Sequence, residues 1–381
     1  MFRVLFLFHI FFFNYVSAAC PPHLSAFSMI FPAKFIFLSE DLNSEEPQTI
    51  PGLIAAKILN EFKNESPKIL FLGSSKTFSL VKKIASKSSQ PSLVNAKLSL
   101  YETNPAQFQQ DVFESFYDEP NKSIIIRQFQ GYTPDNKGPD LKKLPSILAT
   151  ENIKAKIGST VNQYGAWLTG VGGNVESTSF GLNLIGSGEF SQENASSFVL
   201  GLFPKAKDTI LFDTSWLALG HIDEVLVEIK SNNDPNGCES TFLINSPKLG
   251  LSFEKNKENS KENLELQKKF EYYKKQLVSA SKGSCKIKFI EVPMVYKKSP
   301  DSYKRTVYAT EYPSFTNGLL IKDRYFLVQE DNDKIKKSVE KSLKSIGIKT
   351  VWVPVKKGLY SKGIVDGYLH CLTNSIRVCE Q

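Results

Sequence analysis

Two short motifs contain the residue types of a cysteine-dependent catalyst. Residues 220–224 read Gly-His-Ile-Asp-Glu, and residues 370–374 read His-Cys-Leu-Thr-Asn. Together they supply a candidate base, a candidate nucleophile and a carboxylate. The whole chain contains only four histidines, and two of them lie in these motifs. A cysteine-dependent enzyme is therefore the leading hypothesis.

Backbone alternation predicts different roles for the two histidines. If residues 219–225 are extended, His221 and Asp223 point to the same face and Glu224 to the other. His370 and Cys371 are adjacent, so on a strand they point to opposite faces, and His221 is the better candidate to activate the thiol. Each motif alone also fits a simpler interpretation, in which the histidine is a surface or core residue and Cys371 is buried or disulfide-bonded.

A third polar segment, residues 110–114, reads Gln-Asp-Val-Phe-Glu. If it is extended, Gln110 and Glu114 share one face and Asp111 takes the opposite one; the alternative is a solvated acidic turn. Further along, the glycine cluster at 170–173 leads into Asn-Val-Glu at 174–176. Glycine there predicts a tight backbone that another group approaches closely.

Alternating strands and amphipathic helices must position these motifs. Apolar, β-branched runs predict buried strands at 68–72, 123–126, 209–212, 224–229 and 349–353. Apolar residues at helical spacing predict helices at 53–62, 257–279 and 333–346, the last closed by Gly347. In the helix at 257–279, Leu264, Leu266, Phe270 and Leu277 are the predicted apolar face. The pattern indicates one α/β domain over residues 20–381, without a linker.

The N-terminus resembles a secretory signal peptide over residues 1–19. A basic start precedes an almost wholly apolar run at 4–13, and small residues follow at 16–19. The alternatives are an uncleaved anchor and an N-terminal core strand. We therefore predict a secreted, extracellular protein with no membrane association after cleavage. The net charge of +8 is modest for this length, and we expect no nucleic-acid partner.

Five cysteines are present, so one thiol stays free or pairs between chains. In an oxidising compartment Cys238 could bridge Cys285, and Cys20 could bridge Cys379. This pairing, one of several that the sequence allows, leaves Cys371 reduced, as a nucleophile requires.

The order of the motifs resembles the catalytic region of the protein-arginine deiminases. Gln-Asp-x-x-Glu, Gly-Asn-x-Glu, Gly-His-x-Asp-Glu and His-Cys-x-Thr-Asn follow one another from residue 110 to residue 374. These enzymes belong to the pentein, or guanidino-group-modifying, superfamily. The resemblance implies a five-bladed α/β propeller with pseudo-fivefold symmetry, and a protein-arginine deiminase-like catalytic domain over residues 20–381.

The resemblance also implies the active residues. The nucleophile matches Cys371, the general acid/base matches His221, and the two carboxylates that hold the guanidinium match Asp111 and Asp223. A guanidinium is planar, always charged and rich in N–H donors, which suits carboxylates on two sides. The implied reaction is hydrolysis of arginine in a protein or peptide to citrulline and ammonia, through a thiouronium intermediate on the cysteine.

Calcium (Ca²⁺) dependence is implied in the same way. The family ligands match the side chains of Gln110, Glu114 and Glu176 and the backbone carbonyls of Gly172 and Val175, an all-oxygen set that suits calcium. We expect one ion, because Arg127 and Gln128 stand where the ligands of the family's second site would be.

Two departures bear on the substrate. Leu372 stands where the family has glycine after the cysteine, and the arginines that grip a substrate backbone have no counterpart around Tyr132 and Thr133. The alternatives are therefore action on free arginine or another small guanidine, amidino transfer to an amine, and a catalytically silent binding protein of the same fold. A cytoplasmic location, as in many family members, is the alternative to secretion. The sequence does not determine the oligomeric state.

Overall fold

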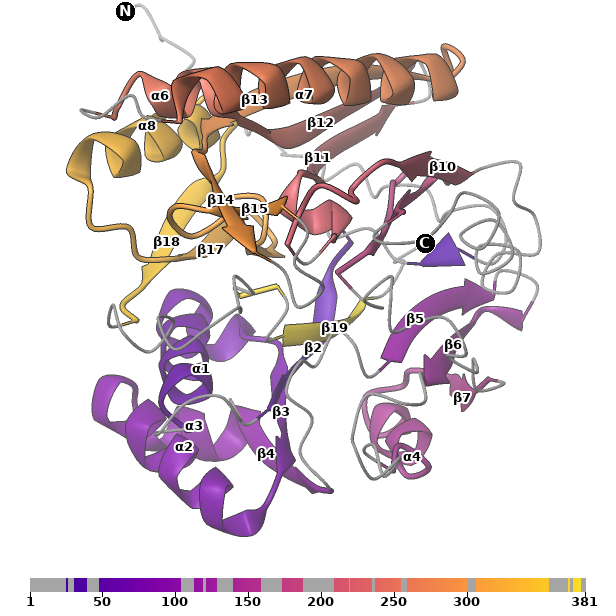
Figure 1. Cartoon of the computed structure of the whole chain (residues 1–381). Coiled ribbons are helices and arrows are strands. Elements are labelled where there is room, and N and C mark those ends of the chain that lie inside the picture. The colour runs from indigo at the N-terminus through magenta and orange to yellow at the C-terminus, as the bar shows by residue number, and fades with distance from the viewer. Residues whose placement is uncertain are drawn as a thin grey trace, which may run out of the picture.

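The computed structural model describes residues 25–26, 31–39, 48–103, 113–118, 121–128, 140–158, 173–187, 209–218, 220–234, 237–254, 259–300, 306–355, 369–370 and 373–377 (Figure 1). The strands are β1 (Ser25–Ala26), β2 (Ala33–Ser39), β3 (Lys68–Gly73), β4 (Leu98–Glu102), β5 (Phe113–Asp118), β6 (Ser123–Gln128), β7 (Ala155–Ile157), β8 (Val175–Ser177), β9 (Asn183–Gly186), β10 (Thr209–Phe212), β11 (Leu226–Asp234), β12 (Gly237–Ser246), β13 (Cys285–Pro293), β14 (Tyr296–Pro300), β15 (Thr306–Thr310), β16 (Leu319–Ile321), β17 (Arg324–Val328), β18 (Lys349–Val353) and β19 (Thr373–Arg377). The helices are α1 (Thr49–Phe62), α2 (Ser75–Ser88), α3 (Pro91–Lys97), α4 (Leu144–Ala149), α6 (Pro247–Leu251), α7 (Ser260–Ala280) and α8 (Asp333–Lys344), with short 3₁₀ turns η1 (Lys63–Glu65) and η5 (Ile222–Glu224).

One pairing pattern recurs in five separate sheets. The sheet orders are β19-β2-β3-β4, β1-β5-β6-β7, β10-β9-β8, β11-β12-β13 and β16-β17-β18, and β14 and β15 form a further two-stranded ribbon. In each of the five sheets an inner strand pairs antiparallel on one side and parallel on the other. The predicted mixed α/β class is therefore confirmed. The described strands form open sheets, and the five-bladed propeller stays a prediction.

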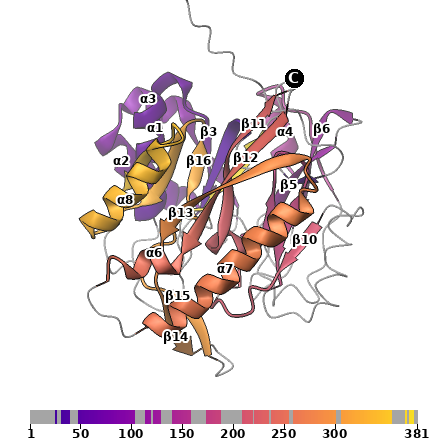
Figure 2. The ribbon, with the colours of Figure 1, turned by 90° about the horizontal axis from the view of Figure 1, so that it is seen from above.

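Helices lie in the crossovers of most of the parallel pairs that the structure describes, because two parallel strands cannot be joined by a tight turn. Helix α1 connects β2 to β3, α4 lies between β6 and β7, α6 and α7 lie between β12 and β13, and α8 connects β17 to β18. Figures 1 and 2 show α1, α7 and α8 at the periphery with the strands between them.

Most of the predicted elements are confirmed. The predicted strands at 68–72, 123–126, 209–212 and 349–353 lie within β3, β6, β10 and β18, and the three predicted helices correspond to α1, α7 and α8. Gly347 follows α8 with φ of +81° and its N–H bonds the carbonyl of Lys344 at 3.0 Å, as a helix-terminating glycine does. The strand predicted at 224–229 is wrong at its start, because residues 222–224 form η5.

The largest core packs between α7 and the β11-β12-β13 sheet. Phe270 and Leu277 of α7 are fully buried there, and the Trp216 ring meets those of Phe270 and Tyr296 edge-on at centroid distances of 5.8 and 5.2 Å. The prediction fails at Leu264, which is 47% exposed. Tyr273 takes a core position instead, and its hydroxyl accepts from Trp216 Nε1 at 2.8 Å.

A disulfide joins Cys238 to Cys285, which is one of the pairings that the sequence allows. The two residues stand opposite each other in the parallel pair β12 and β13, with Cα atoms 4.5 Å apart. The predicted Cys20–Cys379 bridge lies outside the described residues. Disulfides persist in oxidising compartments, and the predicted secretion stays a prediction.

We expect the double variant Cys238→Ser/Cys285→Ser to lose about 4 kcal/mol of unfolding free energy, because the bond closes a loop of 47 residues in the unfolded chain. Urea unfolding measures the change. Dithiothreitol should lower the midpoint of the wild type far more than that of the double variant. An equal drop in both would show that this bond is not the stabilising one.

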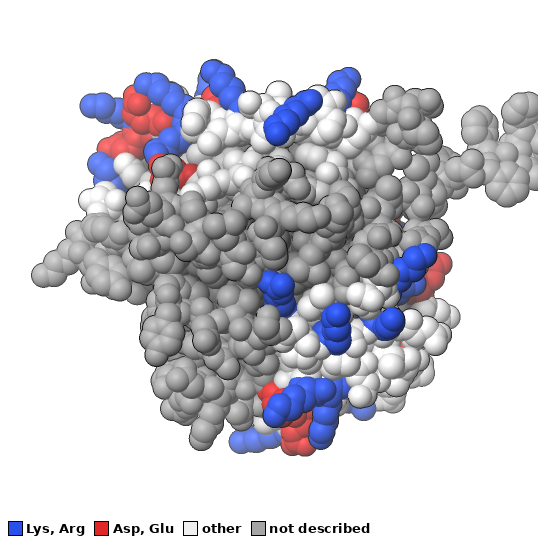
Figure 3. Space-filling model, turned by 90° about the vertical axis from the view of Figure 1, so that its right-hand side faces the viewer, with Lys and Arg blue, Asp and Glu red and all other residues white. Residues whose placement is uncertain are grey.

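On the surface drawn in Figure 3, lysine and arginine occur in separate groups with acidic residues among them, rather than as one continuous basic patch over the described part of that face. Within the described ranges, no helix combines the length and apolar character needed to cross a membrane.

Candidate active site

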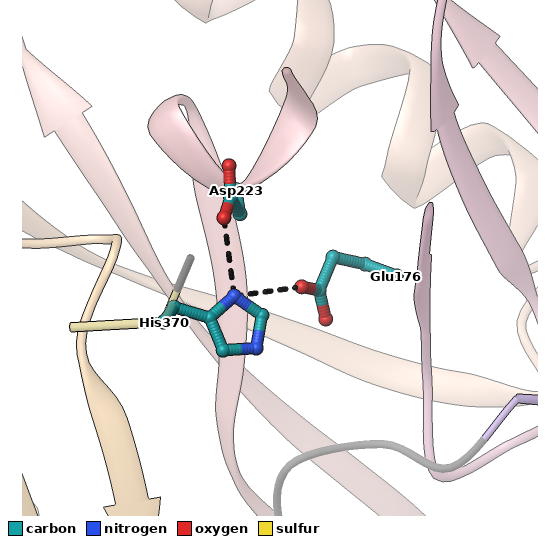
Figure 4. Close-up of side chains that lie close together, drawn as sticks. All are labelled: Glu176, Asp223 and His370. Carbon is teal, nitrogen blue, oxygen red and sulfur yellow. Dashed lines mark hydrogen bonds and ion pairs between the residues drawn. The ribbon is translucent and has the colours of Figure 1, made fainter. Parts of the chain in front are cut away.

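Three buried ionisable side chains from distant parts of the sequence point toward one another (Figure 4). Glu176 comes from β8, Asp223 from η5, and His370 from the turn that precedes β19. His370 Nδ1 lies 3.1 Å from Asp223 Oδ2 and 3.4 Å from Glu176 Oε1. Glu176 is 5% exposed, Asp223 is 0% exposed and His370 is 9% exposed. Buried charges are held only where opposite charges or hydrogen bonds compensate them, and here they compensate one another.

The segment that carries His221 and Asp223 is a turn rather than the predicted strand. Gly220 has φ of +74°, His221 is extended, and η5 follows with a bond from Val225 N–H to the Ile222 carbonyl at 2.9 Å. The alternation argument therefore does not apply. The turn is stabilised by Gly173 and Asn174, which directly precede β8, are remote in sequence and accept the N–H groups of Asp223 and Ile222.

Gly173 and Asn174 hold this turn in place. The Gly173 carbonyl accepts from Asp223 N–H at 3.1 Å, and Asn174 Oδ1 accepts from Ile222 N–H at 3.1 Å. Asn174 in turn donates to the Gly186 carbonyl at 2.6 Å. The Gly-Asn-x-Glu motif thus has a structural explanation: its first two residues fix the turn bearing Asp223, and its Glu176 faces His370.

The prediction of close approach at the glycine cluster is confirmed at Gly173. A Cβ atom placed on Gly173 would lie 2.7 Å from Asp223 Oδ2 and 2.8 Å from His221 Nδ1. Both side chains are buried, so neither can swing away freely. His221 and Asp223 therefore share one small space, although not for the reason that strand alternation gave.

We expect Gly173→Ala to displace His221 and Asp223 and, in a reaction that these side chains catalyse, to lower kcat/KM by about 100-fold or more, because a displacement of roughly 1 Å costs that much. Gly283→Ala is the control: it strains a left-handed residue whose Cβ would meet nothing within 4 Å, so it should lower stability without changing kcat/KM. Steady-state kinetics on both variants, with thermal unfolding, measure the difference. Equal activity in Gly173→Ala and wild type would contradict the tight packing.

Asn317 is a site residue that the sequence did not reveal. Its Nδ2 donates to Asp223 Oδ2, and its Oδ1 accepts from His370 N–H at 3.2 Å. The loop before β16 that carries it is anchored by Tyr325, whose hydroxyl donates to the Thr316 carbonyl at 2.9 Å and accepts from Gly318 N–H at 3.1 Å. No motif surrounds Asn317, so only the tertiary contacts identify it.

The position of His370 also differs from expectation. Residues 369–370 lie in a turn, and β19 begins only at Thr373, so the alternation that turned His370 away from its neighbour does not apply. Thr373 holds the turn, with its N–H bonded to the His370 carbonyl at 3.0 Å and its hydroxyl to the Leu369 carbonyl at 2.8 Å. The scarcity of histidine was the one signal in the sequence that favoured His370.

The two histidines have pKa values shifted in opposite directions. Burial lowers the pKa of His221, helped by repulsion from His370 and opposed by attraction to Asp223. Burial also opposes charge on His370, but the carboxylates of Glu176 and Asp223 outweigh it and leave the pKa of His370 raised. The two shifts favour the neutral form of His221 and the protonated form of His370. Opposite shifts of this kind characterise acid/base pairs.

The structure describes only part of the predicted site, and the predicted catalytic and metal-binding roles stay predictions. His221, Asp223, Val175 and Glu176 are described, whereas Asp111, Cys371, Gln110 and Gly172 lie outside the described residues. Glu114 lies in β5, but its side chain is not described. Leu372, Tyr132 and Thr133 also lie outside. Chemically, the described cluster can bind a cation through two carboxylates and exchange protons through two histidines.

The chain has the mixed α/β fold of known deiminases, which chemically modify guanidino groups. The C. jejuni agmatine deiminase matches it with a TM-score of 0.57 and 15% identity, over 94% of this chain and 96% of the other. A protein described provisionally as a peptidyl-arginine deiminase matches with 0.58 and 13%, over 93% and 99%. The agmatine deiminase of Enterococcus faecalis matches with 0.57 and 12%, over 94% and 96%.

Sequence comparison adds nothing to this likeness, because no family model and no curated protein matches the chain. At such low identity the structural likeness shows the fold alone. Fold does not by itself determine activity, which must be argued from the site.

Proposed function

We propose that the protein hydrolyses a guanidinium group to a urea and ammonia, with a small guanidine such as agmatine or free arginine as substrate. The observation that carries this proposal is the convergence of Glu176, Asp223 and His370 in one buried cluster beside His221. The buried Asp223 carboxylate suits a cationic substrate, and the full-length likeness to agmatine deiminases favours a small one. Arginine in a protein or peptide is the second candidate substrate, favoured by the four motifs in the sequence.

Asp223 is the proposed guanidinium ligand. Asn317 donates to Asp223 Oδ2 and is itself held by the backbone N–H of His370, so this carboxylate has a fixed position. Asp111 is the proposed second carboxylate. Planar guanidinium and carboxylate groups form parallel, charge-assisted hydrogen bonds, and a clamp on two sides would orient the central carbon for attack.

The proposed nucleophile is the Cys371 thiolate. The thiol proton passes to the neutral His221, the thiolate attacks the guanidinium carbon, and His221 returns this proton to the departing ammonia, which leaves an S-alkyl thiouronium. Water, deprotonated by the neutral His221, then attacks the same carbon and releases the urea product and the thiolate. The directly preceding residue, His370, would supply positive charge that favours the thiolate. Overall, guanidinium and water give urea and ammonium.

Calcium belongs to this proposal as a structural ion. Its proposed ligands are the side chains of Gln110, Glu114 and Glu176 and the carbonyls of Gly172 and Val175. Glu176 is a buried carboxylate, the donor type that calcium takes. Bound there, the ion would fix the segment before β5 that carries Asp111. We also propose secretion after cleavage of residues 1–19, and a five-bladed arrangement of the five sheets.

We expect ammonia release with agmatine and free arginine to exceed that with benzoyl-arginine amide, because no arginine in the region of Tyr132 and Thr133 would grip a peptide backbone. A coupled ammonia assay on all three substrates, with and without a calcium chelator, measures both claims. Turnover of benzoyl-arginine amide alone would shift the proposal to protein arginine. Rates that do not change on chelation would contradict the calcium proposal. Absence of turnover with every guanidine would favour a catalytically silent binding protein.

A further inference from the structure

The cluster of Glu176, Asp223 and His370 has the dimensions of a metal site. One ligand atom from each residue lies within 4.8 Å of the others, and all three residues are buried. The two distances from His370 Nδ1 are 3.1 Å to Asp223 Oδ2 and 3.4 Å to Glu176 Oε1. A tetrahedral ion with ligand distances of about 2.0–2.2 Å separates its ligand atoms by about 3.3–3.6 Å. The two distances therefore nearly match a shared ion.

The donor chemistry selects the kind of metal. Calcium and magnesium prefer oxygen ligands, whereas an imidazole nitrogen with carboxylates suits zinc and other first-row transition ions. Two carboxylates and a neutral imidazole carry two negative charges, which a divalent ion neutralises. Entry of the ion would displace the proton that His370 shares with the carboxylates, as metal binding at histidine generally does.

A second layer of contacts is in place around these ligands. Asn317 Nδ2 donates to Asp223 Oδ2, the atom that also faces His370. Asn317 Oδ1 accepts from the backbone N–H of His370 at 3.2 Å. The Gly173 carbonyl accepts from Asp223 N–H at 3.1 Å. Contacts of this kind orient metal ligands and contribute to affinity.

We propose that Glu176, Asp223 and His370 form a transition-metal site, with Zn²⁺ as the fitting ion, and that an ion there excludes the guanidinium from Asp223. The exclusion, which rests on the proposed function, follows because both cations need the same carboxylate. Zn²⁺ would also compete with calcium for Glu176. Zn²⁺ is therefore an inhibitor of this protein, unlike calcium.

Equilibrium titration of the metal-free full chain with ZnCl₂ tests the site without any substrate. We expect one ion per chain, with binding weakened at least 100-fold in His370→Ala and in Glu176→Gln. Asn317→Ala should weaken it by about 10-fold, because outer contacts are worth about 10- to 100-fold. Glu291→Gln is the control: Glu291 of β13 pairs with Lys274 of α7, and its substitution should leave zinc affinity unchanged.

Cys371 is the competing ligand, since it follows His370 directly and thiolates bind zinc. We expect Cys371→Ala to keep its zinc affinity, and X-ray absorption of the zinc-loaded wild type to show nitrogen and oxygen ligands without sulfur. The absorption spectrum needs no variant, so it decides the question even if a substitution impairs folding. A sulfur ligand, loss of binding in Cys371→Ala with retention in Glu176→Gln, or no saturable binding would overturn the site.

Inhibition is measured separately. Zn²⁺ should raise the apparent KM for the guanidine substrate without lowering kcat, and excess substrate should restore the rate. Purely noncompetitive inhibition would overturn the exclusion while leaving the metal site. Should no guanidine be turned over at all, the proposed function fails, and the titration and spectrum still decide the metal site.

Discussion

Asp223→Asn is expected to lower kcat/KM on the guanidine substrate by about 10²- to 10⁴-fold. Asp223 is fully buried and faces His370 at 3.1 Å, so its charge cannot be replaced by solvent. Hydrogen bonds to charged groups are each worth about 1.5–3 kcal/mol, and a bidentate clamp loses two of them. Since about 1.4 kcal/mol corresponds to tenfold in rate, the two bonds account for the predicted range.

The distribution of the Asp223→Asn loss between kinetic constants is informative. Weaker substrate binding alone would raise KM, whereas misplacement of the reacting carbon would lower kcat. Asp323→Asn is the matched control, since Asp323 is exposed beside Arg324 in the β16–β17 turn, and it should keep wild-type kinetics. Wild-type kcat/KM in a folded Asp223→Asn protein would rule out Asp223 as the guanidinium ligand.

Cys371→Ala is expected to reduce ammonia release to the uncatalysed background, because no thiouronium can form without the sulfur. Binding should survive, since Asp223 and His370 are unchanged, so isothermal titration with substrate should give a Kd close to the wild-type KM. When turnover by the wild type is quenched with acid, mass spectrometry should show a covalent adduct on the peptide that contains Cys371.

Alkylation tests the role of Cys371 without a substitution. Iodoacetamide should inactivate the wild type, and substrate should protect it, whereas the disulfide of Cys238 and Cys285 should not react. Thermal unfolding of Cys371→Ala should stay close to that of the wild type. A folded Cys371→Ala protein with full activity would refute covalent catalysis at this residue.

The opposite pKa shifts of His221 and His370 bear on the predictions for Asp223→Asn and Cys371→Ala. His221 has its pKa lowered by burial, and His370 has its pKa raised by two carboxylates that outweigh its burial. These directions favour the neutral form of His221, the proposed base, and the protonated form of His370, which directly precedes the proposed nucleophile. Sequence alone could not assign these roles, because each shift depends on carboxylates that folding brings close.

Local patterning determined most of the elements of the fold. The strands within β3, β6, β10 and β18 and the helices α1, α7 and α8 follow from apolar spacing and from stop signals such as Gly347, which act over a few residues. The Cys238–Cys285 bond could be anticipated as one pairing among several. Residue types and motif order also singled out His221, Asp223 and Glu176.

Tertiary structure alone decided how those residues meet. The turn η5 replaced an expected strand because Gly173 and Asn174 accept its N–H groups. His370 and Asn317 both contact Asp223, from which they are separated by 147 and 94 residues in the sequence. Strand alternation assumes that neighbours along the chain set the direction of a side chain. Here bonds from remote residues set it, and no local pattern in the sequence encodes them.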